Sequence, residues 1–310
     1  YLLLRRVMLG LGFSLSTPTT ASSLEWSATK YLALPGASDD YARVQNFSSF
    51  LGRISDAGSD DIADTITISF WIRPIWVMGY SGANQNVTSA TGTQNNVPLA
   101  VFGNTSTEKD RLRVVYMIDT GGSSDRNRIM VHAMDASGNQ ERDEAFLHDA
   151  NNSITGLGSV LSNTGISSGW WHNSNKGNVN SDDFVHLCFV RSSGDWTIYW
   201  NSQALGGSLD FDSGTLAFDE NNVDEFWLGR SFVNQDFVKM GYRDIAYFNT
   251  AFTLSQVQEI YNSGNLFDVR THSQAAKLGL YWPCQDASEF SGAGSSADLD
   301  LQGNASFKAL

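Results

Sequence analysis

The stretch Asp182–Gly264 decides the fold, and its first part reads DDFVHLCFVRSSGDWTIYWNSQAL (182–205). Two runs within it, Phe184–Arg191 and Trp196–Asn201, carry few polar residues on either side of their alternation. The polar turn Ser192–Asp195 joins them and contains a glycine. Apolar runs of this length, joined by a short polar turn, are typical of a hairpin inside a stack of sheets. We therefore predict two buried antiparallel strands here.

The rest of this stretch predicts two more strands and a helix. The aromatic-rich segment EFWLGRSF (225–232) reads as a strand, and Tyr242–Asn249 reads as another. Thr253 then offers a hydroxyl at the start of a short helix, Leu254–Tyr261, whose apolar residues lie on one face. Gly264 is predicted to end this helix, because glycine tolerates the left-handed conformation that follows many helices.

In this order, the pieces resemble the concanavalin A-like jelly roll of the laminin-G and pentraxin type. The family motifs "WHHVAVTRD", "WKLYVDGKLV", "LGR" and "GxIDEVRIYNRALSxxEIxxLY" match four segments here: Asp183–Arg191, Trp196–Leu205, Trp227–Arg230 and Gly241–Tyr261. The pair Arg243-Asp244 stands where the family usually has Asp-Glu. The resemblance implies an all-β, two-sheet antiparallel sandwich. It does not fix a function, because this fold hosts lectins, adhesive modules, viral proteins and glycanases.

Outside that stretch, the sequence predicts further strands and two long loop insertions. DTITISFWIRP (64–74) alternates clearly and resembles the family's "FTISFWVKP" strand. Other expected strands are Pro98–Phe102, Leu112–Asp119, Arg128–Asp135, Leu278–Trp282 and, as the last strand, Leu299–Leu301. The Gly-, Asn- and Ser-rich segments 75–97 and 138–180 read as insertions. We expect one jelly-roll domain, residues 24–310, with one short helix.

The composition limits the classes of function. Of the 310 residues, 41% are hydrophobic and 12% aromatic, which is enough for a core, and only 17% are charged. The net charge of -13 argues against nucleic-acid binding, which needs a basic surface. No run reaches the roughly 18 apolar residues that a membrane span requires. For Cys188 and Cys284 we favour buried free thiols over a disulfide, although both interpretations remain open.

Residues 1–23 read as an arm. Leu9, Leu11, Phe13 and Leu15 alternate with small residues, as in a strand that joins the sheet of a partner. The segment MLGLGFSLS (8–16) resembles the openings of laminin-G-like virion proteins in tailed bacteriophages. This resemblance implies an anchor on another virion subunit or on a second copy of the chain. The alternative is that the arm forms the first strand of the sandwich itself.

Two groups of residues are candidates for ligand binding. Aromatic residues in the insertions could stack on sugar rings, with Asn and Asp nearby for the hydroxyls; these are Trp170, Trp171, His172, Trp76 and Tyr80. The competing interpretation is that they pack onto the sandwich. Asp39 and Asp40 could hold Ca²⁺ in a loop, since this ion prefers oxygen ligands, but aspartate is also common in turns. No other cofactor is expected.

Catalytic patterns are weak. Glycanases on this sandwich carry the pattern Glu-x-Asp-x-x-Glu on one strand, because two carboxylates must share a face. The nearest match, Glu141–Glu144, falls in an expected insertion. The histidines form no zinc-type pair, and His186 takes the place of a structural histidine of the family. We therefore expect no enzyme.

These observations favour a structural or adhesive virion protein of a tailed phage, either a capsid decoration protein or a tail or fibre component. Its partners would be other virion subunits or copies of itself, and cell-surface glycans are candidate ligands. The alternative is a secreted or cell-surface lectin, located outside the cell rather than on a virion. A glycoside hydrolase has the least support.

Overall fold

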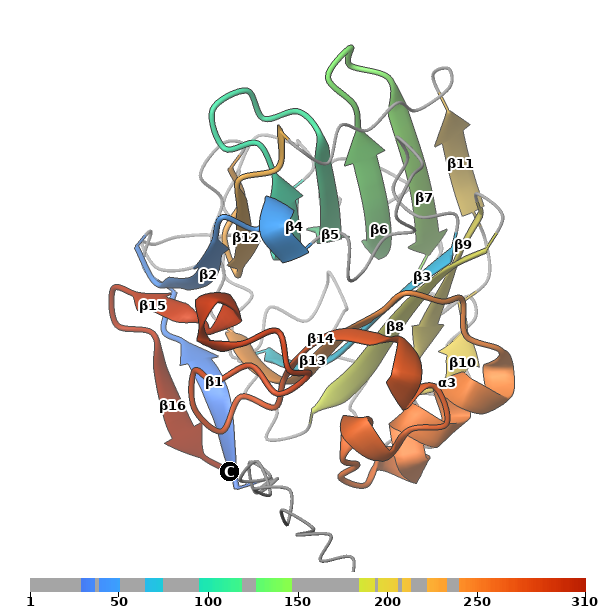
Figure 1. Ribbon diagram of the computed structural model, residues 1–310. Helices are drawn as coiled ribbons and strands as arrows, with labels where there is room; N and C mark the ends of the chain where they lie inside the picture. Colours follow the sequence, from blue (N-terminus) through green and yellow to red (C-terminus); the bar gives the residue numbers. More distant parts are fainter. Residues whose placement is uncertain are drawn as a thin grey trace, which may run out of the picture.

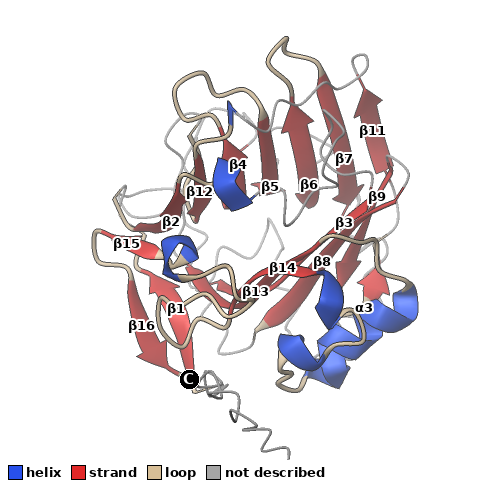
Figure 2. Cartoon of the chain, viewed as in Figure 1, coloured by secondary structure: helices blue, strands red, loops and turns tan. Residues whose placement is uncertain are grey.

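The computed structural model describes residues 29–36, 39–50, 65–74, 95–118, 127–146, 184–192, 195–205, 208–212, 222–232 and 240–310. Within these residues the chain forms two antiparallel sheets of eight strands each, facing one another (Figures 1 and 2). The fold is the all-β jelly-roll sandwich that the sequence predicts. No helix of the described residues is long and apolar enough to cross a membrane.

Sheet A has the strand order β10-β9-β8-β3-β13-β1-β16, and β14 also pairs with β13. Its strands are β1 (Lys30–Leu34), β3 (Thr65–Pro74), β8 (Val185–Ser192), β9 (Asp195–Trp200), β10 (Gln203–Ala204), β13 (Met240–Phe248), β14 (Leu278–Trp282) and β16 (Ser306–Ala309). The central strands β3, β8 and β13 come from the stretches with the clearest sequence patterns.

Sheet B has the order β11-β7-β6-β5-β4-β12-β2-β15. Its strands are β2 (Tyr41–Gln45), β4 (Asn95–Gly103), β5 (Arg111–Ile118), β6 (Asn127–Met134), β7 (Gln140–Phe146), β11 (Ser208–Asp212), β12 (Glu225–Leu228) and β15 (Asp300–Gln302). The strands β4 to β7 form a meander, in which each strand pairs with the next along the chain.

The alternation in the β8–β9 hairpin separates two buried layers. Leu187 and Phe189 of β8 point into the core between the sheets, where Trp200 and Ile198 lie directly opposite them. Cys188 points to the other face, where it belongs to a second buried cluster. Because both faces are buried, both sets of positions are apolar, and this explains why the sequence shows little polar alternation.

The second cluster exists because α3 (Leu254–Tyr261) covers the outer face of sheet A. Val257 and Ile260 of α3 are buried in this cluster. At its start, the Gln256 side chain accepts a hydrogen bond of 2.8 Å from the backbone N–H of Thr253. The helix ends at a left-handed Asn262 (φ 47°), and not at Gly264 as predicted. Asparagine can replace glycine there because it tolerates this conformation.

Several predicted boundaries are wrong. Residues 140–146 of the expected second insertion form β7, and residues 95–97 of the first belong to β4. The strand expected over 225–232 ends at Leu228, and β16, not the strand near Leu299, is the last. A helical turn at residues 48–50 was also not expected. The missed strands are polar or lie at sheet edges, where alternation is weak.

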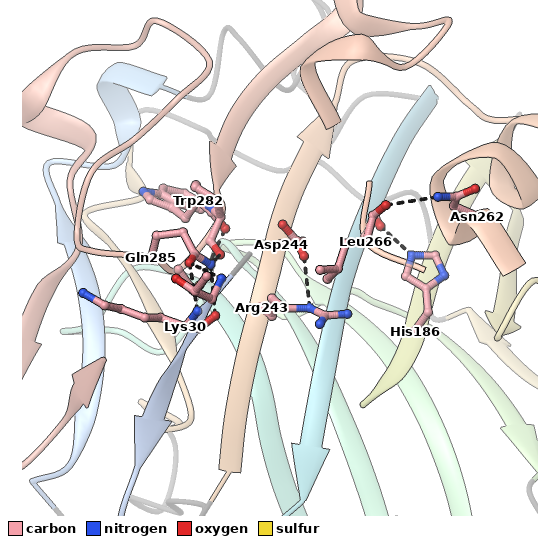
Figure 3. A network of polar contacts seen from close by, with 12 residues as sticks. Lys30, His186, Arg243, Asp244, Asn262, Leu266, Trp282 and Gln285 are labelled. Carbon is pink, nitrogen blue, oxygen red and sulfur yellow. Dashed lines mark hydrogen bonds and ion pairs between the residues drawn. The ribbon is translucent and has the colours of Figure 1, made fainter. Parts of the chain in front are cut away.

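Gln285 fixes the beginning of β1. Its side-chain oxygen accepts hydrogen bonds of 2.9 Å from the backbone N–H groups of Thr29 and Lys30, and its nitrogen donates to the Lys30 carbonyl (3.0 Å; Figure 3). The Leu310 N–H donates to the Thr29 carbonyl at 2.9 Å. Thr29 is therefore held both by the loop that follows β14 and by the residue that follows β16. The predicted arm, residues 1–23, lies outside the described residues.

Both cysteines are buried and free, as favoured from the sequence. Cys188 packs under α3, while Cys284 lies in the core between the sheets. Burial raises the pKa of both thiols, because a low-dielectric surrounding disfavours the thiolate. They act as small apolar residues.

Candidate functional site

An aromatic and polar surface lies on the outer face of sheet B, where β15, β2 and β12 run side by side. The register places Arg43 directly opposite both Asp300 and Trp227. The alternate residues of β2 and β12, such as Val44 and Phe226, lie in the core. Because side chains alternate along a strand, Arg43 and Trp227 therefore point outward.

Four side chains form the centre of this surface. The rings of Tyr41 and Trp227 have centroids 4.8 Å apart, and Phe232 meets Trp227 edge-on at 4.7 Å. The guanidinium carbon of Arg230 lies 4.9 Å from the Tyr41 ring centroid and 5.1 Å from that of Trp227. Tyr41 and Phe232 are buried, whereas Trp227 and Arg230 are partly exposed. We call this group the Tyr41–Trp227 platform.

Charged side chains border the platform. Arg43 Nε donates to Asp300 at 2.9 Å, and Arg43 Nη1 lies 3.4 Å from a Glu225 oxygen. The indole N–H of Trp227 also donates to Glu225. The Asp300 side chain is 49% exposed and that of Glu225 18%, so solvent reaches this border. A flat apolar ring bordered by charged groups can receive a sugar, whose apolar face stacks while its hydroxyls form hydrogen bonds.

A group of charged and aromatic side chains around Arg243 lies on the outer face of sheet A, but it is buried. The Arg243 guanidinium carbon lies 4.8 Å from the centroid of Trp71 and 4.7 Å from that of Phe184. Its Nε is 3.1 Å from a carboxylate oxygen of Asp244, which occupies a bulge of β13 with φ 49° (Figure 3). Asp244 also accepts a hydrogen bond of 2.9 Å from the hydroxyl of Tyr281.

Burial changes the acid–base properties of this pair. It raises the pKa of Asp244 to about 7, since Arg243 and Tyr281 compensate only partly for the lost water. It also lowers the pKa of Arg243. Both side chains are less than 10% exposed. A pair so enclosed joins β13 to β14 through Tyr281 and offers no surface to a ligand.

His186 and Ser69 form a pair that resembles a base and a nucleophile, since His186 Nε2 lies 2.8 Å from the serine oxygen. Both residues are sealed from solvent. Burial and the nearby charge of Arg243 lower the pKa of His186 to about 3, and no described residue forms a hydrogen bond with His186 Nδ1 to orient the ring. This geometry suits a structural histidine, as the sequence indicates.

The nearest match to a glycanase pattern, Glu141–Glu144, lies on β7 and not in a loop as predicted. Glu141 occupies the space between the sheets, where it accepts hydrogen bonds from Arg191 Nη2 (2.8 Å) and from the indole of Trp196 (3.0 Å). The position that would complete Glu-x-Asp-x-x-Glu is Phe146. Glu141 therefore connects the two sheets.

Most of the ligand-binding residues predicted from sequence lie outside the described residues: Trp170, Trp171, His172, Trp76, Tyr80 and the arm residues Leu9, Leu11, Phe13 and Leu15. Asp39 is exposed in a turn. Asp40 is buried, and its carboxylate accepts hydrogen bonds from the backbone (2.7 Å) and side chain (3.1 Å) of Asn304. Among the described residues, no group of three His, Cys, Asp or Glu could hold a metal ion. Calcium binding stays a prediction.

The platform was missed in the sequence because its members are far apart along the chain. Tyr41 and Trp227 become neighbours only through the pairing of β2 with β12. The available signal was the segment EFWLGRSF, where Trp227 alternates with buried Phe226 and Leu228 on a strand. An aromatic residue at an outward position of a strand is a candidate for binding.

Comparison with protein-family models finds no match, and neither does comparison with curated proteins. Solved structures with a similar fold include the heptameric SAP-like pentraxin from Limulus polyphemus, with 10% identity over 89% of this chain and 95% of that chain and a TM-score of 0.43. The tailspike protein 2 of an Escherichia coli O157:H7 bacteriophage shares 13% identity over 85% of this chain and 31% of that chain, with a TM-score of 0.41. The botulinum neurotoxin type G receptor-binding domain shares 14% over 64% and 38%, with a TM-score of 0.37. At these values the likeness concerns the fold alone.

Proposed function

We propose that this chain is a non-catalytic carbohydrate-binding module and that the Tyr41–Trp227 platform is its sugar-binding surface. The observation that carries the proposal is a partly exposed tryptophan, Trp227, held rigidly by Tyr41 and Phe232 and bordered by Arg43 and Glu225. A fixed aromatic ring loses little conformational entropy when a sugar stacks on it. The charged border supplies donors and acceptors for hydroxyl groups.

We further propose that the module belongs to a tailed-phage virion, as a decoration, tail or fibre component anchored by residues 1–23. The support is the resemblance of residues 8–16 to virion proteins and the apolar alternation of Leu9, Leu11, Phe13 and Leu15. The hydrogen bonds from Thr29 and Lys30 to Gln285 would transmit a force on the arm to the loop that follows β14. The alternative setting is a secreted lectin with the same binding surface.

The absence of hydrolase activity is also our proposal. Two observations support it. The carboxylate of Glu141 accepts hydrogen bonds from Arg191 and Trp196, and Phe146 stands at the position of the second carboxylate of the pattern. Purified protein should release no reducing sugar from glucans or galactans above a blank without protein. Release that persists through purification and disappears in Glu141→Gln would contradict this proposal.

The test of the binding surface compares two aromatic substitutions on a glycan array. Trp227→Ala should reduce binding about fivefold or more, because loss of one stacking ring costs roughly 1–3 kcal/mol of binding energy. The matched control is Phe290→Ala, since Phe290 is also a half-buried aromatic residue but packs on the outer side of sheet A. Equal binding by both variants and the unchanged protein would rule out the platform.

The setting is tested separately. Immunogold labelling of native particles from the source should place the chain on a head, tail or fibre. Detection only in the particle-free supernatant would favour the secreted lectin.

A further inference from the structure

Arg230 differs from the other arginine of the platform because it has no acidic partner among the described residues. Arg43 lies within ion-pair distance of both Glu225 and Asp300. The described contacts of Arg230 are those with the rings of Tyr41 and Trp227, and its Nε is buried without a hydrogen-bond partner. Arg191, Arg243 and Arg270 each have a carboxylate within 4.0 Å. In the part of the chain that the structure describes, no carboxylate forms an ion pair with Arg230 at the platform.

The Arg230 side chain is already oriented. The planar fork of a guanidinium group matches a carboxylate in bidentate geometry. The two aromatic rings restrict the side chain, so a ligand would lose less entropy in fixing it. The residue preceding it, Gly229, is held by a hydrogen bond of 3.2 Å from its N–H to the Leu99 carbonyl.

We propose that the platform selects carboxylated sugars, with the acid group bound by Arg230 and the sugar ring resting on the exposed part of Trp227. This inference rests on the proposed carbohydrate binding at the same surface. The net charge of -13 repels dense polyanions at long range, so the specificity comes from one local contact. The ligand class is therefore a uronic or sialic acid residue within a glycan, and not a heavily sulfated chain.

The experiment measures the affinity of the full chain for pairs of glycans by titration calorimetry. Each pair contains a galacturonic, glucuronic or sialic acid oligosaccharide and its methyl ester, which lacks the negative charge but keeps the ring. We expect at least one acid to bind tenfold or more tightly than its ester. Arg230→Gln should reduce that ratio to about one, and Arg230→Lys should leave an intermediate ratio, because lysine keeps the charge but loses the fork.

Arg270→Gln serves as the matched control. Arg270 is also partly exposed and lies over an aromatic ring, that of Phe290, but it is paired with Asp268 on the outer side of sheet A. This variant should keep the full ratio of acid to ester. Thermal unfolding of every variant checks that the sandwich is intact.

The outcomes separate the two proposals. If acid and ester bind equally and Trp227→Ala weakens both, carbohydrate binding at the platform stands and the selection of acids is wrong. If an acid binds more tightly but Arg230→Gln keeps the ratio, the acid is recognised elsewhere and the inference is also wrong. If no neutral or acidic glycan binds, both proposals fail.

Discussion

At the scale of single residues, Asp244 on the outer face of sheet A is a carboxyl group whose pKa is strongly raised by burial. Burial raises its pKa to about 7 in the folded chain, whereas an unfolded aspartate titrates near 3.8. The folded state therefore binds this proton more tightly than the unfolded state does. The stability that this contributes is complete below pH 4 and is lost as the pH rises to about 7.

The Asp244→Asn variant has no titrating group at this position, so it tests whether the raised pKa of Asp244 makes stability depend on pH. The difference in unfolding free energy between the variant and the unchanged protein should shift in favour of the variant between pH 4 and pH 7, by up to about 4 kcal/mol, and then stay constant. The variant can be less stable at low pH, because Arg243 remains buried. The measurement is urea unfolding at several pH values; a difference that does not vary with pH would contradict the raised pKa.

The titrations of His132 and His186 affect stability in the opposite direction to that of Asp244, and they do not change the difference between the variant and the unchanged protein. Burial lowers the pKa of both to about 3. Their contribution to stability is present above pH 6.5 and is lost as the pH falls toward 3. Because the Asp244→Asn variant and the unchanged protein both contain these histidines, they alter each curve of stability against pH but not the difference between the two curves.

Gly303 is a second residue with a sharp expectation. It has φ 61°, and a Cβ there would lie 2.5 Å from the Asp39 carbonyl and 2.6 Å from an Asp40 oxygen. Gly292 has φ 88° with nothing within 4 Å of its Cβ position. Gly303→Ala should destabilise the chain by roughly 2–4 kcal/mol, and Gly292→Ala by about 1 kcal/mol, since only the first adds a clash to the backbone strain. If the Gly303→Ala and Gly292→Ala variants had equal midpoints of thermal unfolding, the turn at Gly303 would accommodate the methyl group without a clash.

At the scale of elements, β7 shows why some strands are hard to predict. Its sequence, QERDEAF, has charged residues at the positions that face the core. Glu141 is accommodated there because Arg191, fifty residues away in the sequence, meets it from the other sheet. Strands β8 and β14 and helix α3 were predictable, because their apolar periodicity is local. The platform was not, since it depends on which strands pair.

The link between the sheets gives an element-scale prediction. The side chains of Arg191 and Glu141 are 4% and 13% exposed, so removal of one partner leaves a buried charge. Glu141→Ala should therefore destabilise the chain by roughly 3–5 kcal/mol. The double variant Glu141→Ala with Arg191→Met should recover part of this loss. Denaturant unfolding measures both; a single variant as stable as the unchanged chain would show that the ion pair contributes little.

At the scale of the whole molecule, the anchoring arm can be tested by deletion. Strand β1 is held by β13, β16 and Gln285, and none of these contacts involves residues 1–23. A chain that starts at residue 24 should fold with an unchanged circular dichroism spectrum, but it should no longer join the assembly. Failure to fold would show that the arm is a strand of the sandwich, which is the alternative interpretation of its sequence.

The hydrogen bond between Leu310 and Thr29 places these two residues side by side at the same end of the antiparallel pair β1 and β16. A two-residue Asn-Gly link would join these positions, because such a turn connects directly paired antiparallel residues. New ends can then open between the exposed residues Ala136 and Ser137 in the turn from β6 to β7. This circular permutant, without residues 1–28, should unfold cooperatively. It would move the attachment point to the turn between β6 and β7, the third and second strands from the β11 edge of sheet B, and so change the orientation of the platform relative to anything fused to the chain.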